Sequence, residues 1–165
     1  MLKIIITGPE SSGKTTLSKK LAKHFNLSLT HEFAREYIDK LNRAYQKNDL
    51  IAIAKEQLHS EEHSELLDTD LITLKIWSLY KYGSCDNWIL ENVECQKKEN
   101  RLYVLCKPDI NWKADSQREN PHDREELFSV YEQELLRLKH DYFIVEGENR
   151  LKKCITKIAP LISVI

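Results

Sequence analysis

The segment "GPESSGKT" at residues 8–15 constrains this chain more than any other feature of its sequence. It fits the pattern G-x-x-x-x-G-K-[ST], in which two glycines let the backbone curl so that successive N–H groups point at phosphate oxygens. The run before it, "LKIIIT", is short, apolar and β-branched, which is typical of a buried strand. After it, Leu17, Leu21 and Phe25 recur at helical spacing. The sequence therefore predicts a strand, a phosphate-binding loop and a helix over residues 14–25.

The side chains of this loop have specific expected roles. Lys14 is expected to supply a positive charge to the β- and γ-phosphates of ATP or GTP, and the Thr15 hydroxyl is an expected Mg²⁺ ligand. With an average glycine usage of ~7%, a chance match in a chain of 165 residues has odds of roughly half a percent. A plain strand–helix turn would also need neither Lys14 nor Thr15. The expected nucleotide-binding residues are Gly8, Glu10, Ser11, Ser12, Gly13, Lys14, Thr15 and Thr16.

Strand-like and helical patterns alternate along the rest of the chain. The strand-like runs are "LSLTHE", "ELLDTD", "RLYVLCK" and "YFIVEG". The alternation predicts an α/β fold with a parallel sheet, and the length suits one domain over residues 1–165. Helical apolar faces are expected over residues 33–45, over 50–58 with Asn48 or Asp49 as N-cap, over 71–82, over 127–138 and over 151–162.

Residues 107–125, "KPDINWKADSQRENPHDRE", interrupt this alternation. They are polar, hold two of the four prolines and show no sustained apolar period, so we expect a lid inserted between a strand and a helix. Arg118 and Arg124 on such a lid would close over a transferring phosphoryl group, neutralise its charge and exclude water. Trp112 is either a hinge anchor or a stacking surface.

Charged side chains follow the second and third predicted strands. Glu32, Arg35 and Glu36 come directly after the second strand, and Asp68 and Asp70 after the third. Because ligands gather at the carboxyl ends of strands in an open parallel sheet, we expect both groups to face the phosphate loop. Asp68 is the expected catalytic base or Mg²⁺ ligand, and Glu32 is the alternative base. Asp70 is equally well placed as the N-cap of the next helix, and Arg35 could simply pair with Glu32 or Glu36.

The charge balance excludes several classes of partner. Lys and Arg total 25 against 26 Asp and Glu, so nothing indicates a nucleic-acid or membrane surface, and a small molecule is the expected partner. The four cysteines fit neither a zinc pair nor a C-x-x-C redox motif, and a reducing, cytoplasmic setting is expected. "HSEEH" at residues 59–63 matches an inverted zinc-peptidase pattern, but the run is very polar and no third ligand follows it. We interpret it as a solvated helix end.

Four segments taken together resemble a known family. "ITGPESSGKTTLSKKLA", "EFAREYI", "DTDLITLKIW" and "KPDINWKADSQRE" with a following "DRE" are similar, in this order, to segments of one group of kinases. That group is the ribosylnicotinamide kinase domain of the bacterial NAD-biosynthesis regulator (NadR-like), with its stand-alone AAA-type P-loop relatives. The resemblance covers nearly the whole chain. The phosphate loop is shared with many NTPases, whereas the other three segments are much more restricted.

The resemblance implies a fold, a reaction and a set of site residues. The fold would be a three-layer P-loop NTPase of the nucleoside- and nucleotide-kinase type with a lid insertion. The reaction would transfer the γ-phosphoryl group of ATP to the 5′-hydroxyl of nicotinamide riboside, with ATP and Mg²⁺ as cofactors and with Thr15 and Asp68 holding the metal. The catalytic residues would be Lys14, Asp68, Glu32, Arg118 and Arg124, and the substrate-binding residues Glu32, Phe33, Arg35, Glu36 and Asp70.

The chain departs from the family pattern in the interval between Gln57 and Asp68, which is several residues short and leaves "ELL" as a meagre third strand. It also begins directly at the loop, without the nucleotidyltransferase domain of the bifunctional regulators, so adenylylation is not expected. Two alternatives stay open. One is a kinase for another nucleoside or a nucleoside monophosphate, for which Arg35 and Arg101 are the obvious spare arginines. The other is a P-loop ATPase that acts as a nucleotide-dependent switch or binding module.

Overall fold

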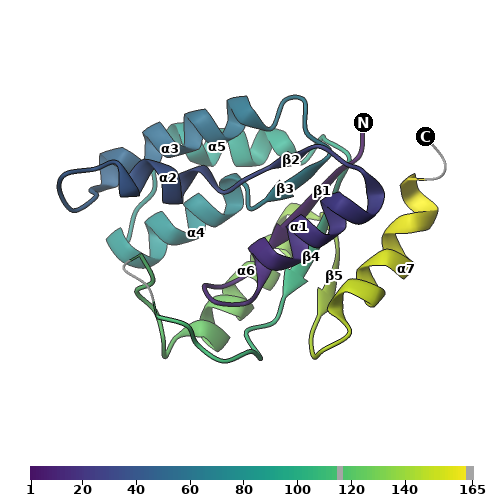
Figure 1. Cartoon of the computed structure of the whole chain (residues 1–165). Helices are drawn as coiled ribbons and strands as arrows, with labels where there is room; N and C mark the ends of the chain where they lie inside the picture. Colours follow the sequence, from purple (N-terminus) through teal and green to yellow (C-terminus); the bar gives the residue numbers. More distant parts are fainter. Residues whose placement is uncertain (115–116, 163–165) are drawn as a thin grey trace.

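The computed structural model describes residues 1–114 and 117–162. Its strands are β1 Lys3–Thr7, β2 Leu29–Thr30, β3 Leu66–Asp68, β4 Arg101–Cys106 and β5 Asp141–Val145. They form one parallel sheet in the order β2-β3-β1-β4-β5 (Figure 1). The predicted α/β fold with a parallel sheet is therefore confirmed. Because β1 is central, the phosphate loop that follows it lies at the middle of the carboxyl edge of the sheet.

Helices cover both faces of this sheet. They are α1 Lys14–Phe25, α2 Phe33–Asp39, α3 Lys47–Ser60, α4 Leu71–Tyr82, α5 Asn87–Gln96, α6 Arg124–Leu138 and α7 Arg150–Ile162. α1 and α7 pack on one face, α3 to α6 lie over the other, and α2 packs against α3 (Figure 1). This is the three-layer arrangement that was expected.

Side chains of β1 alternate between two hydrophobic cores. Ile5 belongs to the core beneath α3 to α6, whereas Ile4 and Ile6 belong to the core beneath α1 and α7, because successive residues of a strand point to opposite faces. Cys106 and Cys154 are free thiols buried in this second core, as predicted. The two cores hold the central strand, and therefore the start of the phosphate loop, between packed layers.

The third strand is short, as the sequence indicated, but it pairs in register. β3 lies opposite Ile4–Ile6 of β1 over its whole length, and its residues are buried. Asp68, its last residue, therefore comes to the carboxyl edge of the sheet beside β1. Asp70 caps α4 by accepting a hydrogen bond from the Ile72 N–H (3.1 Å), so of the two roles that the sequence left open for it, the structure shows the N-cap. The helix predicted over residues 71–82 coincides with α4.

The boundaries predicted for the helices over residues 33–45 and 50–58 are wrong. The helix expected over residues 33–45 ends at Asp39. The carboxylate of Asp49 accepts hydrogen bonds from Arg43 (2.7 and 2.8 Å) and from the Gln46 N–H (2.7 Å), which fixes a turn instead. Gln46 is therefore the N-cap of α3, and Asp49 lies in the first turn of that helix.

α5 lies in a segment for which no element was predicted. Asp86 caps it by accepting a hydrogen bond from the Trp88 N–H (2.8 Å). Ile89 and Val93 are the residues that it buries in the core next to α4. Two buried apolar residues four positions apart are too weak a pattern to stand out in a charged stretch.

The connection between β4 and α6 has no helix or strand over its described residues, 107–114 and 117–123. The lid predicted over residues 107–125 is two residues shorter, because Arg124 already begins α6, and its positions 115–116 lie outside the described residues.

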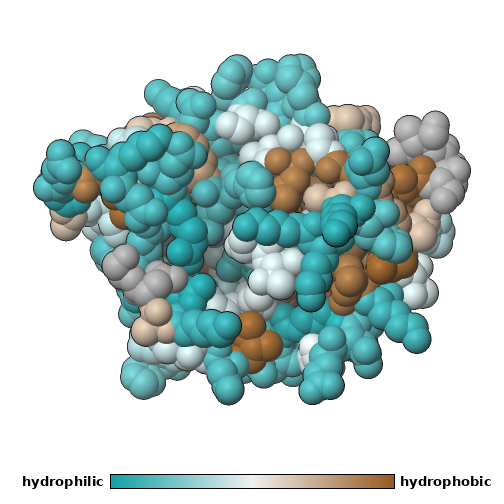
Figure 2. Space-filling view, viewed as in Figure 1, coloured by the Kyte–Doolittle hydropathy of each residue, from teal (hydrophilic) through white to brown (hydrophobic). Residues whose placement is uncertain are grey.

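Figure 2 shows hydrophobic residues gathered around α1 and α7, while the left side of the same view is largely hydrophilic. None of the described helices is both long enough and apolar enough to cross a membrane.

Candidate active site

The phosphate loop adopts backbone conformations that require glycine. Gly8 has a φ of +133° and Gly13 a φ of +83°. A Cβ atom on Gly8 would lie 2.6 Å from the carbonyl oxygen of Cys106 on β4, so no side chain fits there. Ser11 also has a positive φ, of +51°, which is uncommon for a residue other than glycine. The loop is therefore held in the curled form that phosphate binding needs.

Lys14 and Ser12 both bind the Pro9 carbonyl oxygen inside this loop. The Lys14 ammonium and the Ser12 hydroxyl each donate a hydrogen bond of 2.7 Å to it. The lysine side chain therefore curls back over the loop, as a lysine that contacts the β- and γ-phosphates must do. All eight predicted nucleotide-binding residues line one pocket: Gly8, Glu10, Ser11, Ser12, Gly13, Lys14, Thr15 and Thr16.

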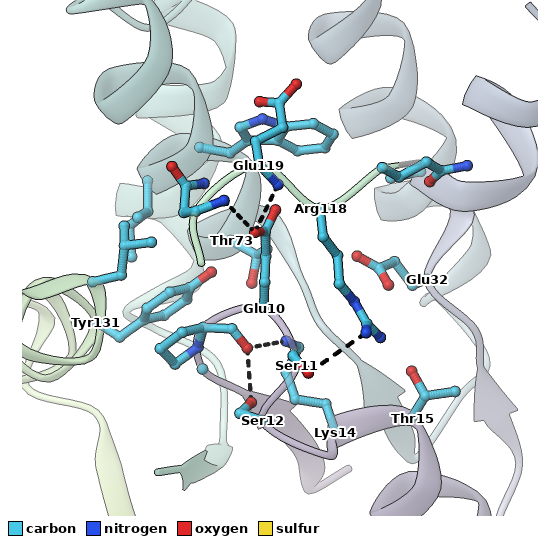
Figure 3. A pocket seen from close by; sticks show the side chains of 18 of the residues that line it. Glu10, Ser11, Ser12, Lys14, Thr15, Glu32, Thr73, Arg118, Glu119 and Tyr131 are labelled. Carbon is cyan, nitrogen blue, oxygen red and sulfur yellow. Dashed lines mark hydrogen bonds between the residues drawn. The ribbon is translucent and has the colours of Figure 1, made fainter. Parts of the chain in front are cut away.

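The pocket has a volume of about 300 Å³ and extends from the phosphate loop between α2, α4, α6 and the lid. That volume is at the lower end of the range for small-molecule sites. In Figure 3, Glu32 and Thr15 lie on one side, Tyr131 lies on the other, and Arg118 reaches from the lid toward Ser11. One cavity thus joins the phosphate loop to a second compartment walled by helices.

Asp68 lies at the end of β3, close to the hydroxyl of Thr15. It is 1% exposed, and among the described residues neither of its carboxylate oxygens has a hydrogen-bond partner in good geometry. Burial raises the pKa of Asp68, while the Thr15 hydroxyl and the charges of Lys14, His31 and Arg35 oppose that rise. A buried carboxylate beside the loop threonine is suited to a hard cation such as Mg²⁺.

Glu32 lines the pocket directly, with 24% of its side chain exposed. Burial raises the pKa of Glu32; Lys14 and Arg35 lower it, and the nearby carboxylates of Asp68 and Glu10 raise it further. The Nε atom of Arg35 is 3.5 Å from the Glu32 carboxylate, which is the ion pair that the sequence left open. A carboxylate with a raised pKa that reaches the pocket is suited to accept a proton.

Both arginines that were predicted on the lid contact the phosphate loop, although Arg124 is the first residue of α6. Arg118 lines the pocket, and its Nη1 atom is 3.5 Å from the Ser11 hydroxyl oxygen. Arg124 donates to the carbonyl oxygens of Ser11 (3.2 Å) and Ile110 (3.0 Å). The Arg124 guanidinium also lies over the Trp112 ring, 5.6 Å from its centroid. Arg118 therefore faces the pocket, whereas Arg124 ties the loop to the β4–α6 connection.

Three of the expected substrate-binding residues are not brought to the pocket. Phe33 packs against the core beneath α3 to α6, and Glu36 is exposed on α2 and pairs with Lys40 (2.5 Å). Asp70 is buried and pairs with Arg101 (3.2 Å). The reason is that α2 and α4 turn other side chains toward the cavity. Arg101, expected as a spare arginine for an acceptor phosphate, is likewise fully buried and does not reach it.

The "HSEEH" run is only partly a solvated helix end. His59 and Glu62 are exposed and lie 3.6 Å apart, but Glu61 is buried and pairs with Arg101 (2.5 Å). Within residues 1–114 and 117–162, no group of three or more His, Cys, Asp or Glu side chains is arranged to hold a metal ion.

Comparison with known proteins places this fold and loop in a family. Residues 3–150 match the AAA domain family. The chain belongs to this family. It is 26% identical over 168 residues to the trifunctional NAD biosynthesis/regulator protein NadR of Escherichia coli (strain K12). The alignment covers 92% of this chain but 40% of that relative, so the chain spans less than half of the relative's length.

Solved structures show the same architecture. A crystal structure of NadR protein in complex with NR has a TM-score of 0.74 at 22% identity, covering 96% of this chain and 51% of that one. Another, of NadR protein in complex with NAD and AMP-PNP, has a TM-score of 0.70 at 22% identity, covering 96% and 49%. Thymidylate kinase from Ehrlichia chaffeensis has a TM-score of 0.59 at 15% identity, covering 98% of both chains. The fold of this AAA-domain chain is that of the P-loop nucleotide kinases.

In this family member, α4 and α6 supply pocket residues that sequence reasoning missed. The α4 segment was interpreted only as a buried helix, although its inward-facing residues recur every three or four positions and include polar and aromatic side chains. That spacing is the signal that would have found them. The residues are Thr73, Ile76, Trp77, Tyr80 and Lys81 on α4, and Leu127 and Tyr131 on α6.

Proposed function

We propose that this chain is a Mg²⁺-dependent kinase that transfers the γ-phosphoryl group of ATP to the 5′-hydroxyl of nicotinamide riboside, forming nicotinamide mononucleotide. The observation that carries this proposal is that one cavity contains both the phosphate loop and Glu32, with Arg118 reaching in from the lid (Figure 3). Phosphoryl transfer needs the donor phosphate and the acceptor hydroxyl to meet in one water-poor space lined with cations. The cations Lys14, Arg35, Lys81 and Arg118 line this cavity, which supports the proposal.

The donor side of the cavity is suited to ATP. Lys14 would contact the β- and γ-phosphates, and Arg118 would neutralise charge on the transferring group from the opposite side. An AMP-PNP complex of NadR, whose fold this chain shares, supports ATP as the donor.

Thr15 and Asp68 would hold the magnesium ion. The buried oxygens of Asp68, which have no hydrogen-bond partner in good geometry within residues 1–114 and 117–162, fit this role. Because Mg²⁺ keeps several waters and binds one or two protein groups plus substrate phosphates, it needs no larger cluster of protein ligands. When bound, the ion would offset the negative charge on the β- and γ-phosphate oxygens.

Glu32 would act on the acceptor. Its carboxylate reaches the cavity, and its raised pKa makes it a better proton acceptor than an ordinary carboxylate. In the reaction, the acceptor hydroxyl oxygen forms a bond to the γ-phosphorus, and the bond from that phosphorus to the β–γ bridging oxygen breaks. The hydroxyl proton passes to Glu32, and ADP leaves.

The cavity is also suited to a flat, positively charged ring. Trp77, Tyr80 and Tyr131 line it, and aromatic faces attract cations. The carboxylates of Glu10 and Glu32 also line the cavity and would favour a cationic acceptor over a neutral one. Nicotinamide riboside carries such a ring and a free 5′-hydroxyl.

One observation favours a second candidate, a nucleoside monophosphate as acceptor. Arg35 and Lys81 both line the cavity, and either could bind an acceptor phosphate. Each already pairs with a carboxylate of the cavity, Arg35 with Glu32 (3.5 Å) and Lys81 with Glu119 (2.7 Å), so we rank this candidate second.

The deciding experiment measures ADP release from the purified protein with Mg-ATP and a panel of acceptors. The panel contains nicotinamide riboside, the common ribo- and deoxyribonucleosides, their monophosphates and a blank without acceptor. We expect a rate well above the blank only with nicotinamide riboside. A rate that rises only with a monophosphate would identify that monophosphate as the acceptor in place of nicotinamide riboside. Rates that stay at the blank value with every acceptor would contradict the kinase proposal and favour a nucleotide-dependent switch.

A further inference from the structure

Glu10 connects the phosphate loop to the lid. Its Oε2 atom accepts hydrogen bonds from the backbone N–H groups of two successive lid residues, Glu119 (3.1 Å) and Asn120 (3.0 Å). Figure 3 shows the side chain extending from the loop toward these amides. Two adjacent N–H groups that converge on one carboxylate oxygen form a small anion site in the lid backbone. The loop itself provides the anion.

A second contact lies next to the first. The Ser11 hydroxyl accepts a hydrogen bond from the Lys113 N–H (3.0 Å) and lies 3.5 Å from Nη1 of Arg118, which also donates to the Lys113 carbonyl. Arg118 immediately precedes Glu119 in the chain. Holding the backbone at Glu119 therefore also holds the position from which the Arg118 side chain enters the cavity.

The side chain of Glu119 attaches the same lid residue to α4. Its carboxylate accepts hydrogen bonds from Lys81 (2.7 Å) and from the hydroxyl of Tyr45 (2.9 Å). The Trp77 indole N–H also donates to the Tyr45 hydroxyl (3.0 Å). Glu119 thus binds the phosphate loop through its backbone N–H. Its carboxylate binds Lys81 on α4, a helix that lines the cavity.

From this geometry we propose that Glu10 is a positioning residue, a latch that holds lid residues 118–120 closed over the loop so that Arg118 faces the transferring phosphate and water is kept out. This inference rests on the proposed kinase function for its effect on the reaction, but the latch itself does not depend on that function. Its role is separate from direct phosphate binding by the loop, because the Glu10 carboxylate is an acceptor directed at backbone amides and not a donor to phosphate oxygens.

If Glu10 holds the lid closed, its loss should shift ATP turnover from phosphoryl transfer toward hydrolysis. In transfer, the γ-phosphorus bonds to the acceptor hydroxyl oxygen; in hydrolysis, it bonds to a water oxygen instead. In both cases the bond to the β–γ bridging oxygen breaks, and the proton of the attacking group leaves to Glu32 or to solvent. An open lid admits water and withdraws Arg118, so it lowers the share of ATP turnover that ends on the acceptor.

Two substitutions separate the latch from a role of the Glu10 charge. Glu10→Ala removes the acceptor oxygen, whereas Glu10→Gln keeps an oxygen at the same reach and removes only the charge. Glu148→Ala, which removes an exposed carboxylate from the loop between β5 and α7, serves as the matched control.

Amide hydrogen exchange tests the latch without any assumption about the reaction. In Glu10→Ala we expect the amides of Glu119 and Asn120 to exchange faster by ~10-fold or more, because their acceptor is gone. Glu10→Gln and the Glu148→Ala control should exchange close to the rate of the unaltered protein. Unchanged exchange at both amides in Glu10→Ala would overturn the proposal.

The ratio of phosphorylated acceptor to released ADP then tests the consequence. We expect this ratio to fall several-fold in Glu10→Ala and to fall less in Glu10→Gln, which keeps an acceptor oxygen for the two lid amides. A ratio that falls equally in both variants, while exchange is slow in Glu10→Gln, would assign the effect to charge and overturn the positioning role. If the unaltered protein phosphorylates none of the acceptors, the proposed function fails, and the exchange experiment still decides the latch.

Discussion

The Nη1 atom of Arg101 lies 3.2 Å from the Oδ2 atom of Asp70, and both side chains are fully buried. The same guanidinium binds Glu61 (2.5 Å), and the hydroxyl of Tyr103 donates to Asp70 (2.6 Å). Asp70 also caps α4 through the Ile72 N–H. This buried network anchors the start of the helix that forms one wall of the cavity, so Asp70 supports the site from behind.

Replacing Arg101 should therefore destabilise the fold strongly. Arg101→Met removes the guanidinium that pairs with the buried carboxylates of Asp70 and Glu61 and leaves Glu61, among the described residues, only the longer ion pair with Lys3 (3.8 Å), which is expected to cost about 3–5 kcal/mol in the free energy of unfolding. Urea denaturation measures this loss. Lys97→Met, which removes a half-exposed partner of Glu94, is the matched control and should cost less than about 1 kcal/mol. Similar losses in the two variants would contradict the importance of the buried network.

Glycine at position 8 is required by a close backbone approach and not only by its dihedral angle. Gly147→Ala places a methyl group in open space at a φ of +69° and should cost about 1–2 kcal/mol, the price of a left-handed alanine. Gly8→Ala should cost more, because its Cβ would lie 2.6 Å from the Cys106 carbonyl oxygen and must push β1 and β4 apart. Thermal unfolding of the two variants at the same pH measures which substitution lowers the stability more.

Asp68→Asn is expected to lower the activity and to raise the stability of the fold. The substitution removes an expected Mg²⁺ ligand, so kcat should fall by ~10²-fold or more. It also removes a buried charge whose oxygens have no hydrogen-bond partner in good geometry among the described residues, so the melting temperature should rise by about 2–4 °C, the shift that ~1 kcal/mol produces in a domain of this size. Calorimetry and steady-state kinetics on the same preparation measure both. A near-normal kcat would move the essential carboxylate to Glu32.

Activity should decline on acidification at a higher pH than ordinary carboxylates would require. Burial raises the pKa of both Asp68 and Glu32, and each must be ionised for its proposed role, so kcat falls as the pH drops through these raised values. The stability effect has the opposite sign. The folded state holds these protons more tightly than the unfolded state, so the contribution of these two groups to stability decreases as the pH rises from the unfolded to the folded pKa. Profiles of kcat from about pH 5 to pH 8, with Asp68→Asn for comparison, test the assignment.

Lys14→Ala should abolish turnover while the chain stays folded. The Lys14 ammonium binds the Pro9 carbonyl within the loop and belongs to neither hydrophobic core, so its loss removes a charge from the phosphate site without opening a cavity in the interior. Circular dichroism and thermal unfolding should match those of the unaltered protein, and ADP release should fall to background. Residual turnover near the normal rate would remove Lys14 from the mechanism.

Sequence reasoning succeeded where a local rule decides the structure. The loop between Gly8 and Thr15, the helix over residues 14–25 and the short strand ending at Asp68 follow from glycine spacing and from runs of apolar residues. The helix predicted over residues 33–45 failed because Asp49 binds Arg43 and draws the chain into a turn, a contact that periodicity does not register.

What the sequence determined by itself is therefore the phosphate loop, the α/β alternation around it and the strand ends at which charges gather, because glycine dihedral freedom and apolar periodicity are properties of neighbouring residues. Only the tertiary structure decided which charges reach the cavity. Glu32 faces the cavity, whereas Asp70 turns inward to Arg101, since the direction of each side chain depends on the elements that pack over it. The compartment beyond the loop is likewise built from α4, α6 and the lid, which are far apart in the chain and meet only when the layers pack.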